Sequence, residues 1–79
     1  MKLRIIRPDE EEQFSIVWLE VETPVGNFVI HSGHAPTLLT LLPTHDIIFK
    51  LKTGEQRSIA IVRGIAEITR EGATIIISE

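Results

Sequence analysis

The feature that most constrains the fold of this chain is its abundance of β-branched side chains. Isoleucine, valine and threonine together supply 25 of the 79 residues. These side chains lose rotamer freedom in a helix but fit well on the pleated surface of a strand. Short apolar runs also recur between turn signals at the spacing typical of sandwiches and barrels. The composition therefore predicts an all-β fold.

The length of the chain limits it to one domain, because a chain this small buries only about 60 % of the surface that its unfolded form exposes. Hydrophobic residues make up 43 % and charged residues 24 %, close to the average for globular proteins and far from the composition of disordered chains. Cysteine is absent, so neither a disulfide nor a thiolate metal site is expected. We expect one domain over residues 1–79 that packing alone stabilises.

The charge distribution excludes several classes of partner. The net charge is −3 and basic residues do not cluster, so DNA and RNA are not expected to bind. The acidic run at residues 9–12 is expected to be a solvated loop. No segment reaches the roughly twenty apolar residues that cross a bilayer, and the N-terminus lacks the apolar region of a signal peptide. We expect a soluble chain without membrane insertion.

Turn residues divide the chain into eight predicted strands. Pro8 ends the first, because proline cannot donate a hydrogen bond to a neighbouring strand. Thr53 and Gly54 separate two extended runs and predict a β-hairpin, and Gly64 predicts a bulge or sharp bend. The predicted strands cover residues 2–7, 14–23, 27–31, 37–42, 46–52, 55–62, 65–69 and 73–78, and the run at 37–42 could instead be a tight connecting turn. The expected product is a compact antiparallel sandwich.

Alternation within the second run predicts which side chains face the core. Val17, Leu19 and Val21 should point inward. Trp18 should point outward on a face that also carries Ile16, Glu20 and Glu22. An exposed aromatic side chain beside an exposed aliphatic one is typical of a contact surface.

The other runs give similar predictions. Phe28 and Ile30 should share one face of their strand. Within the hairpin an inner set should pair across the two strands; it comprises Ile47, Phe49, Leu51, Ile59 and Ile61. The last run, residues 73–78, is unbroken and apolar, which predicts a strand buried on both faces.

Histidines are the only candidates for a metal site. His31 and His34 lie three residues apart, but Gly33 separates them and no carboxylate or cysteine stands at ligand spacing beside them. His34 is better interpreted as a loop residue whose ring contacts nearby backbone groups. Ser32 and His31 are neighbours on an extended chain and should point to opposite sides, so they form no nucleophile and base pair. No nucleotide-binding glycine motif occurs, and we expect no catalytic, cofactor or metal site.

Surface recognition is then the remaining class of function. Trp18 is one candidate contact residue. The segment of residues 26–36, which includes His31, is the other, because turn residues, aromatic side chains and histidines are expected to gather there at one end of the sandwich.

A family resemblance supports this interpretation. Gly26-Asn27-Phe28-Val29-Ile30 followed by Ser32-Gly33-His34-Ala35-Pro36 resembles the N-terminal β-sandwich of the epsilon subunit of F-type ATP synthases, called delta in mitochondria. The likeness extends to the leading Lys-Leu-Arg-Ile-Ile run, to the Thr53-Gly54 hairpin and to residues 63–68. It covers essentially the whole chain.

The resemblance implies a single flattened antiparallel β-sandwich of about eight to ten short strands. It also implies a non-catalytic central-stalk subunit that binds the gamma subunit and the c-ring, and so couples proton transport to ATP synthesis. Such a complex is peripheral to the membrane, on the cytoplasmic face of a bacterial inner membrane. Carried over by position, Gly26, Asn27 and Phe28 match a loop that touches the c-ring, and His34 and Thr37 match positions near gamma and the ring.

Several departures from the family pattern stand beside the resemblance. Members usually continue into a helical hairpin, whereas this chain ends at Glu79, so inhibition of hydrolysis and ATP binding are not expected. Asn27 stands where glutamate is common and Arg63 where a glycine is common, and residues 44–46 replace a Pro-Gly turn. The alternatives are a free-standing β-sandwich module that binds a peptide or glycan and, third, a small metal-dependent enzyme.

Overall fold

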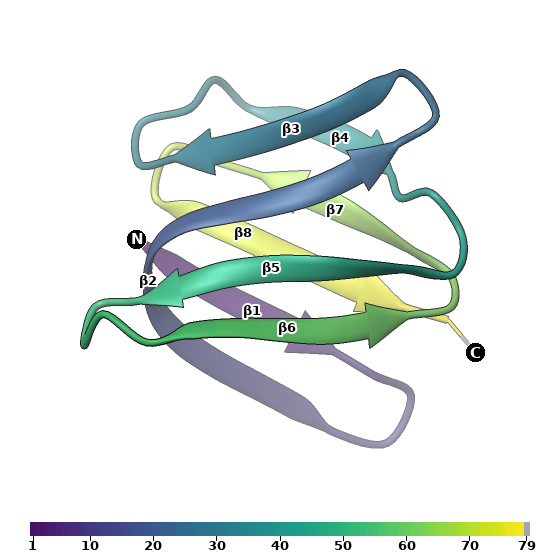
Figure 1. Cartoon of the computed structure of the whole chain (residues 1–79), viewed down its shortest axis with the longest axis horizontal. Coiled ribbons are helices and arrows are strands. Elements are labelled where there is room, and N and C mark those ends of the chain that lie inside the picture. Colours follow the sequence, from purple (N-terminus) through teal and green to yellow (C-terminus); the bar gives the residue numbers. More distant parts are fainter. Residues whose placement is uncertain (79) are drawn as a thin grey trace.

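Eight strands joined by short turns form the computed structural model, which describes residues 1–78 (Figure 1). They are β1 (Lys2–Ile6), β2 (Glu11–Thr23), β3 (Gly26–His31), β4 (Thr37–Thr40), β5 (His45–Leu51), β6 (Gln56–Ile61), β7 (Gly64–Ile68) and β8 (Gly72–Ile77). Residues 1–78 contain no helix. The prediction of an all-β fold with about eight to ten short strands is therefore confirmed.

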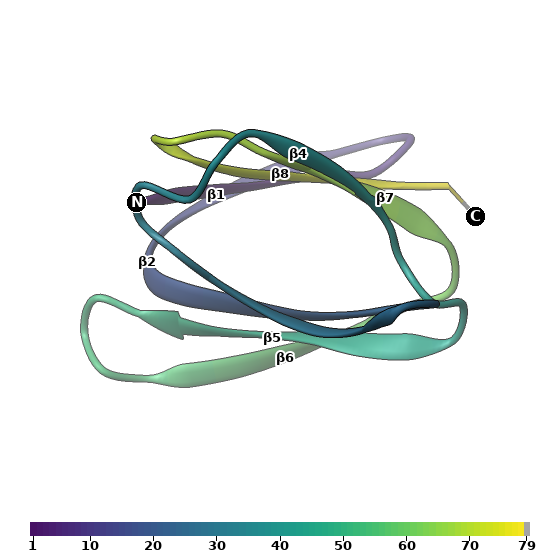
Figure 2. The same cartoon turned by 90° about the horizontal axis from the view of Figure 1, so that it is seen from above.

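The strands form two layers that face each other across the core (Figure 2). One layer has the order β4-β7-β8-β1, and the first half of β2 joins it beside β1. The other has the order β3-β2-β5-β6, formed with the second half of β2. β2 thus belongs to both layers and carries the chain from one to the other. The molecule measures 28 × 27 × 18 Å, which agrees with the predicted flattened sandwich.

One strand pair departs from the predicted antiparallel arrangement. β1 and β8 run parallel, with Lys2 beside Gly72 and Ile6 beside Ile76. They lie at opposite ends of the chain, so no hairpin dictates their relative direction. Gly72 makes the close approach possible, because a β-carbon there would collide with the carbonyl oxygen of Lys2.

β2 contains a bulge that changes which residues face the core. Ile16 pairs with Leu51, whereas Trp18 pairs with Lys50, so Val17 is an extra residue in β2. Ile16 is fully buried and Val17 is 45 % exposed. The prediction placed these two residues on the wrong faces, because it extended one alternation through the whole strand. Beyond the bulge, Leu19 and Val21 are buried as predicted.

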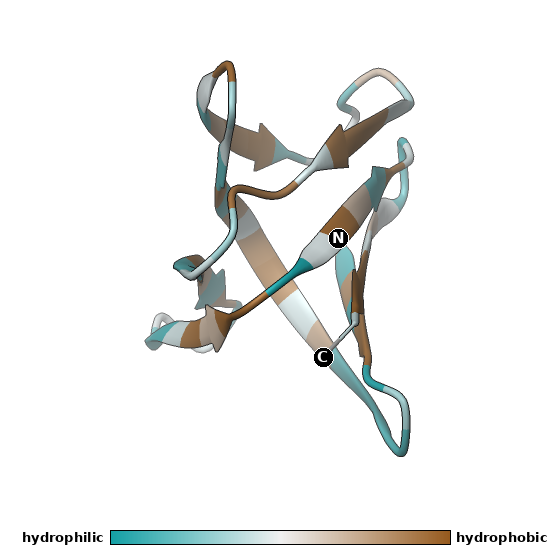
Figure 3. Ribbon diagram, turned by 90° about the vertical axis from the view of Figure 1, so that its right-hand side faces the viewer, coloured by the Kyte–Doolittle hydropathy of each residue, from teal (hydrophilic) through white to brown (hydrophobic). Residues whose placement is uncertain are grey.

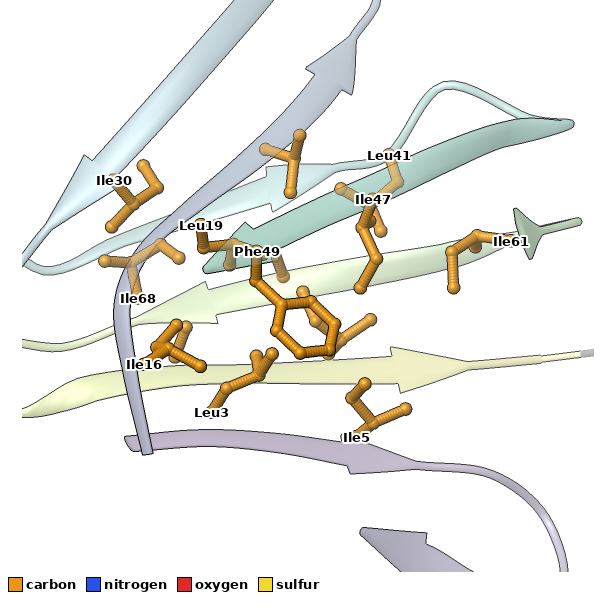
Figure 4. Close-up of a cluster of buried hydrophobic side chains, with 14 of the residues drawn as sticks. Leu3, Ile5, Ile16, Leu19, Ile30, Leu41, Ile47, Phe49, Ile61 and Ile68 are labelled. Atoms are coloured by element: carbon orange, nitrogen blue, oxygen red, sulfur yellow. The ribbon is translucent and has the colours of Figure 1, made fainter. Parts of the chain in front are cut away.

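The core lies between the layers and is mostly isoleucine and leucine (Figure 4). Phe49 is its largest fully buried side chain. In the β5–β6 hairpin Ile47 lies opposite Ile59 as predicted, whereas Ile61 lies opposite His45; the five residues of the predicted inner set are all buried or half-buried. Phe28 and Ile30 share one face of β3 as predicted; this face lies against the core, with Phe28 half-buried and Ile30 buried.

Two further predictions need correction. Ile75 and Ile77 of β8 are buried, but Ile76 is 39 % exposed. The strand is not buried on both faces, because a two-layer sandwich covers only the inner face of each layer. The acidic run is exposed as predicted, yet Glu11 and Glu12 already belong to β2, where they pair with Ile6 and Ile5.

Candidate functional site

Two of the three histidine rings contact the backbone. The Nδ1 atom of His34 lies 2.8 Å from the carbonyl oxygen of Ala35, and that of His45 lies 2.9 Å from the carbonyl oxygen of Pro43. The interpretation of His34 as a loop residue is therefore confirmed. Within residues 1–78, no group of three or more histidines, aspartates and glutamates is arranged to hold a metal ion.

The β2–β3 turn presents an apolar side chain at its tip. The Thr23 hydroxyl donates a hydrogen bond to the carbonyl oxygen of Gly26 (2.9 Å) and accepts one from the Val25 amide (3.2 Å). Gly26 has φ of +126°, a conformation that side chains with a β-carbon rarely adopt. These contacts hold the turn in a shape that leaves Val25 84 % exposed.

Asn27, directly after this turn, is fixed by two carboxylates of the neighbouring strand. Its Nδ2 atom donates hydrogen bonds to Glu20 (3.0 Å) and Glu22 (2.7 Å). The neutral amide thereby lies between two negative charges on the outer face of β2. Part of the predicted contact loop is thus a preformed polar surface.

Trp18 lies in a row of mixed chemistry on the same outer face. It pairs with His31 of β3 on one side and with Lys50 of β5 on the other. The indole is half-buried. The predicted outward pair of Trp18 and Ile16 does not exist, because the bulge turns Ile16 into the core.

The predicted contact residues do not gather at one end of the molecule. β3 runs between the turn at Gly26 and the loop that holds His34 (Figure 1). Asn27 and Phe28 therefore lie toward one end, whereas His34 and Thr37 lie beyond the other, with Thr37 beside Ile68 at the start of β4. The prediction of a single cluster over residues 26–36 was wrong, because an extended strand separates its two halves by its full length.

An open apolar pocket was missed by the sequence analysis. It has a volume of about 480 Å³ and lies where the β2–β3 turn, the connection after β4, the bend between β6 and β7, and β8 come together. Its lining includes Pro24, Leu41, Pro43, Arg63, Ile65 and Ile76. We call it the end pocket. Figure 3 views the molecule from the side on which the end of β8 lies.

The end pocket continues onto the outer face of the β4-β7-β8-β1 layer. Ile65, Ile76 and Ile6 stand side by side on β7, β8 and β1, with Thr40 of β4 beside Ile65, and we call the three isoleucines the apolar row. Ile65 and Ile76 are 36 % and 39 % exposed. A signal for the row was present in the sequence, since three consecutive isoleucines in a two-layer sandwich cannot all face inward.

All 79 residues match one family model. It describes the delta/epsilon chain of ATP synthase, β-sandwich domain, and the match runs over residues 1–79. The chain belongs to the ATP synthase delta/epsilon family. This confirms the resemblance drawn from the Gly26–Pro36 segment and its flanking strands.

Curated relatives agree with this membership. The chain is 32 % identical over 79 residues to the ATP synthase epsilon chain of Wolbachia pipientis wMel, with 99 % of this chain and 68 % of the relative covered. It is 36 % identical over 58 residues to the ATP synthase epsilon chain of Bradyrhizobium sp. ORS 278, with 73 % of this chain and 42 % of the relative covered. The chain thus spans part of the length of these delta/epsilon family members.

Solved structures show the same fold. A chain of the Euglena gracilis mitochondrial ATP synthase complex of OSCP, F1 and c-ring superposes with a TM-score of 0.88 and 24 % identity, over 98 % of this chain and 49 % of that one. A chain of the Tetrahymena thermophila mitochondrial ATP synthase central stalk and c-ring superposes with a TM-score of 0.83 and 14 % identity, over 100 % of this chain and 63 % of that one. At these identities the likeness concerns the fold. Across residues 1–78 we find no helix of the length and apolarity that a membrane crossing requires.

Proposed function

We propose that this chain is a non-catalytic central-stalk subunit of an F-type ATP synthase that binds the gamma subunit and the c-ring. In this role it helps to couple proton transport through the ring to ATP synthesis. The observation that carries the proposal is the family match over residues 1–79. The complex would be peripheral to the membrane, at the cytoplasmic face of a bacterial inner membrane.

The physical properties of the fold suit a mechanical role. Fifteen hydrophobic residues form one continuous buried cluster that links both layers, and β2 belongs to both. A body of this kind transmits force without large internal motion, because close-packed interiors have low compressibility. Both mechanical coupling and simultaneous binding of two partners benefit from such stiffness.

Two chemically different surfaces support the binding of two partners. The outer face of β2 and β3 is mixed, with the polar side chains of Asn27 and His31 beside the indole of Trp18. The end pocket and the apolar row are apolar instead. In our proposal the turn at Gly26, Asn27 and Phe28 contacts the c-ring, and His34 and Thr37 lie near contacts with gamma and the ring.

Co-expression with the cognate gamma subunit tests the proposal. We expect a stable complex on size-exclusion chromatography, and retention of this complex on detergent-solubilised c-ring. A well-folded chain that elutes alone in both experiments would refute the proposal. A homodimer that buries Trp18 would favour the alternative of a free-standing peptide- or glycan-binding module.

A further inference from the structure

The end pocket has the size and the lining of a site for a small molecule. Its volume of about 480 Å³ lies within the range of about 300–1,000 Å³ typical of ligand sites. Most of its wall is aliphatic or proline, and the polar side chains among its described lining residues are those of Thr40, Arg63 and Ser78. An apolar wall with a few polar groups is the usual composition of such sites.

The wall favours a flexible aliphatic chain over a planar ligand. Leu41, Ile65 and Ile76 contribute branched side chains, and no aromatic residue belongs to the described lining. A planar ring system would therefore find no aromatic stacking partner there. A methylene chain gains from every apolar atom that it covers, because the burial of apolar surface is favourable in any direction.

Arg63 defines the charge of the ligand. It is exposed and is the one charged residue of the described lining, which holds no carboxylate. No ion pair joins it to another of residues 1–78. A guanidinium beside an apolar site matches a carboxylate, to which it can donate two parallel hydrogen bonds. One cation balances one negative charge, so a monocarboxylate fits better than a nucleotide with several charged phosphates.

Backbone hydrogen bonds shape the pocket without a ligand. The Leu41 amide donates to the Gly64 carbonyl (3.0 Å), and the Ser78 amide donates to the Arg63 carbonyl (3.0 Å). The start of β7 is thereby tied to the connection after β4 on one side and to the end of β8 on the other. A preformed site lowers the cost of ordering loops on binding.

From these observations we infer that the end pocket is a binding site for a medium-chain aliphatic carboxylate. The alkyl chain lies against Ile65 and Ile76, and the carboxylate accepts hydrogen bonds from Arg63. The inference goes beyond the proposed function and does not depend on it, because one copy of this chain supplies the whole site.

An NMR titration of the purified chain with decanoate tests the site directly. We expect saturable binding with a dissociation constant below about 1 mM, a modest affinity for a ligand of this size. In the series hexanoate, octanoate and decanoate, each added methylene should tighten binding about fourfold, because it buries further apolar surface. Decanol has the same chain without the negative charge and should bind about tenfold more weakly than decanoate.

The amide signals that shift identify the site independently of affinity. We expect decanoate to shift the signals of the pocket residues Leu41, Gly64, Ile65 and Ile76. The signal of Gly54, in the turn between β5 and β6, should stay in place.

Two pairs of variants assign binding to Arg63 and to the pocket. Arg63→Gln should weaken decanoate about tenfold and leave decanol unchanged, whereas its control Arg70→Gln, beyond the opposite end of β7, should bind decanoate like wild type. Thr40 is an exposed lining residue, so Thr40→Trp fills the pocket and should abolish binding of both ligands. Its control, Val29→Trp on the outer face of the other layer, should bind both. A dispersed NMR spectrum of each variant verifies that it is folded.

Several results would overturn the inference. They are a lack of saturable binding, shifts away from the pocket, equal affinities for decanol and decanoate, and an unaltered affinity for decanoate in folded Arg63→Gln or Thr40→Trp. Co-sedimentation with vesicles of anionic phospholipid, without binding of dispersed decanoate, would also overturn it, because the ligand would then be a membrane surface.

These outcomes are separate from those of the co-expression experiment. A chain that forms the complex with gamma but does not bind decanoate refutes the inference and leaves the proposed function intact. A chain that binds decanoate in the pocket but elutes without gamma and the c-ring refutes the proposed function and leaves the inference intact.

Discussion

Ile16 and Trp18 lie on opposite faces of β2, although residues two apart on a regular strand share a face. Ile16 is fully buried and Trp18 is half-buried on the outer side, because the extra residue Val17 interrupts the alternation. We expect Ile16→Ala to lower the free energy of unfolding by about 2–5 kcal/mol, as for other buried isoleucines. Trp18→Ala should cost clearly less. Urea denaturation of both variants measures their free energies of unfolding. Equal losses of this free energy in the two variants would contradict the bulge.

Phe49 is the next test of the core. Its side chain is fully buried and its ring centroid lies 5.0 Å from that of Phe14. We expect Phe49→Ala to cost about 3–5 kcal/mol, a large part of the stability of so small a domain. The neighbouring Lys50→Ala, on the outer face, is the control and should change the denaturation midpoint little. An unchanged midpoint for Phe49→Ala would mean that the hairpin has a different register.

Gly64 stands where a side chain does not fit. A β-carbon there would lie 2.7 Å from the carbonyl oxygen of Ile76, a backbone atom that cannot move without displacing β8. We expect Gly64→Ala to destabilise the fold by about 1–3 kcal/mol, as overpacking does. Ser32→Ala in an exposed loop adds no clash and should be neutral. If Gly64→Ala and wild type have equal midpoints of thermal unfolding, β7 and β8 do not approach as closely at Gly64 as the structure shows.

Arg4 and Glu11 give the fold a dependence on acidic pH. The Arg4 Nε atom lies 3.0 Å from the Glu11 carboxylate, and the hydrogen bond from Arg4, with a second from Gln13, lowers the pKa of Glu11 below its usual value. A carboxyl group whose pKa is lower in the folded state stabilises that state above its unfolded pKa of about 4.3, and this contribution is lost as the pH falls through the folded pKa. An NMR titration should show a lowered pKa for Glu11, which Arg4→Gln should raise. If the pKa of Glu11 is the same in both proteins, the ion pair does not persist in solution.

Asn27 bridges two carboxylates with its amide nitrogen. Asn27→Asp replaces the donor to Glu20 and Glu22 with a third negative charge. We expect a loss of stability at low ionic strength that salt largely restores, because exposed charges are screened within about 10 Å at 0.1 M salt. Asn27→Ala, which removes the amide without adding a charge, should be less sensitive to salt. Parallel denaturation curves at low and high salt measure the difference, and a salt-independent loss in Asn27→Asp would argue against repulsion.

Local patterns predicted most of the strands. The β5–β6 hairpin follows from two alternating runs around Thr53 and Gly54, and the predicted pairing of Ile47 with Ile59 agrees with the structure. The predicted site was less accurate. Asn27 and His34 are close in the sequence, yet β3 separates them by its length.

The sequence by itself determined the all-β class, the positions of the turns and the family, because each depends on neighbouring residues or on the linear order of motifs. Tertiary structure alone decided three other features: the bulge at Val17, the parallel pairing of β1 with β8, and the end pocket lined by segments as distant as Pro24 and Ser78. All three arise from contacts between residues far apart in the chain. The faces that Ile16 and Ile76 occupy depend on those contacts, and the apolarity of a residue does not reveal which side of a sheet it will occupy.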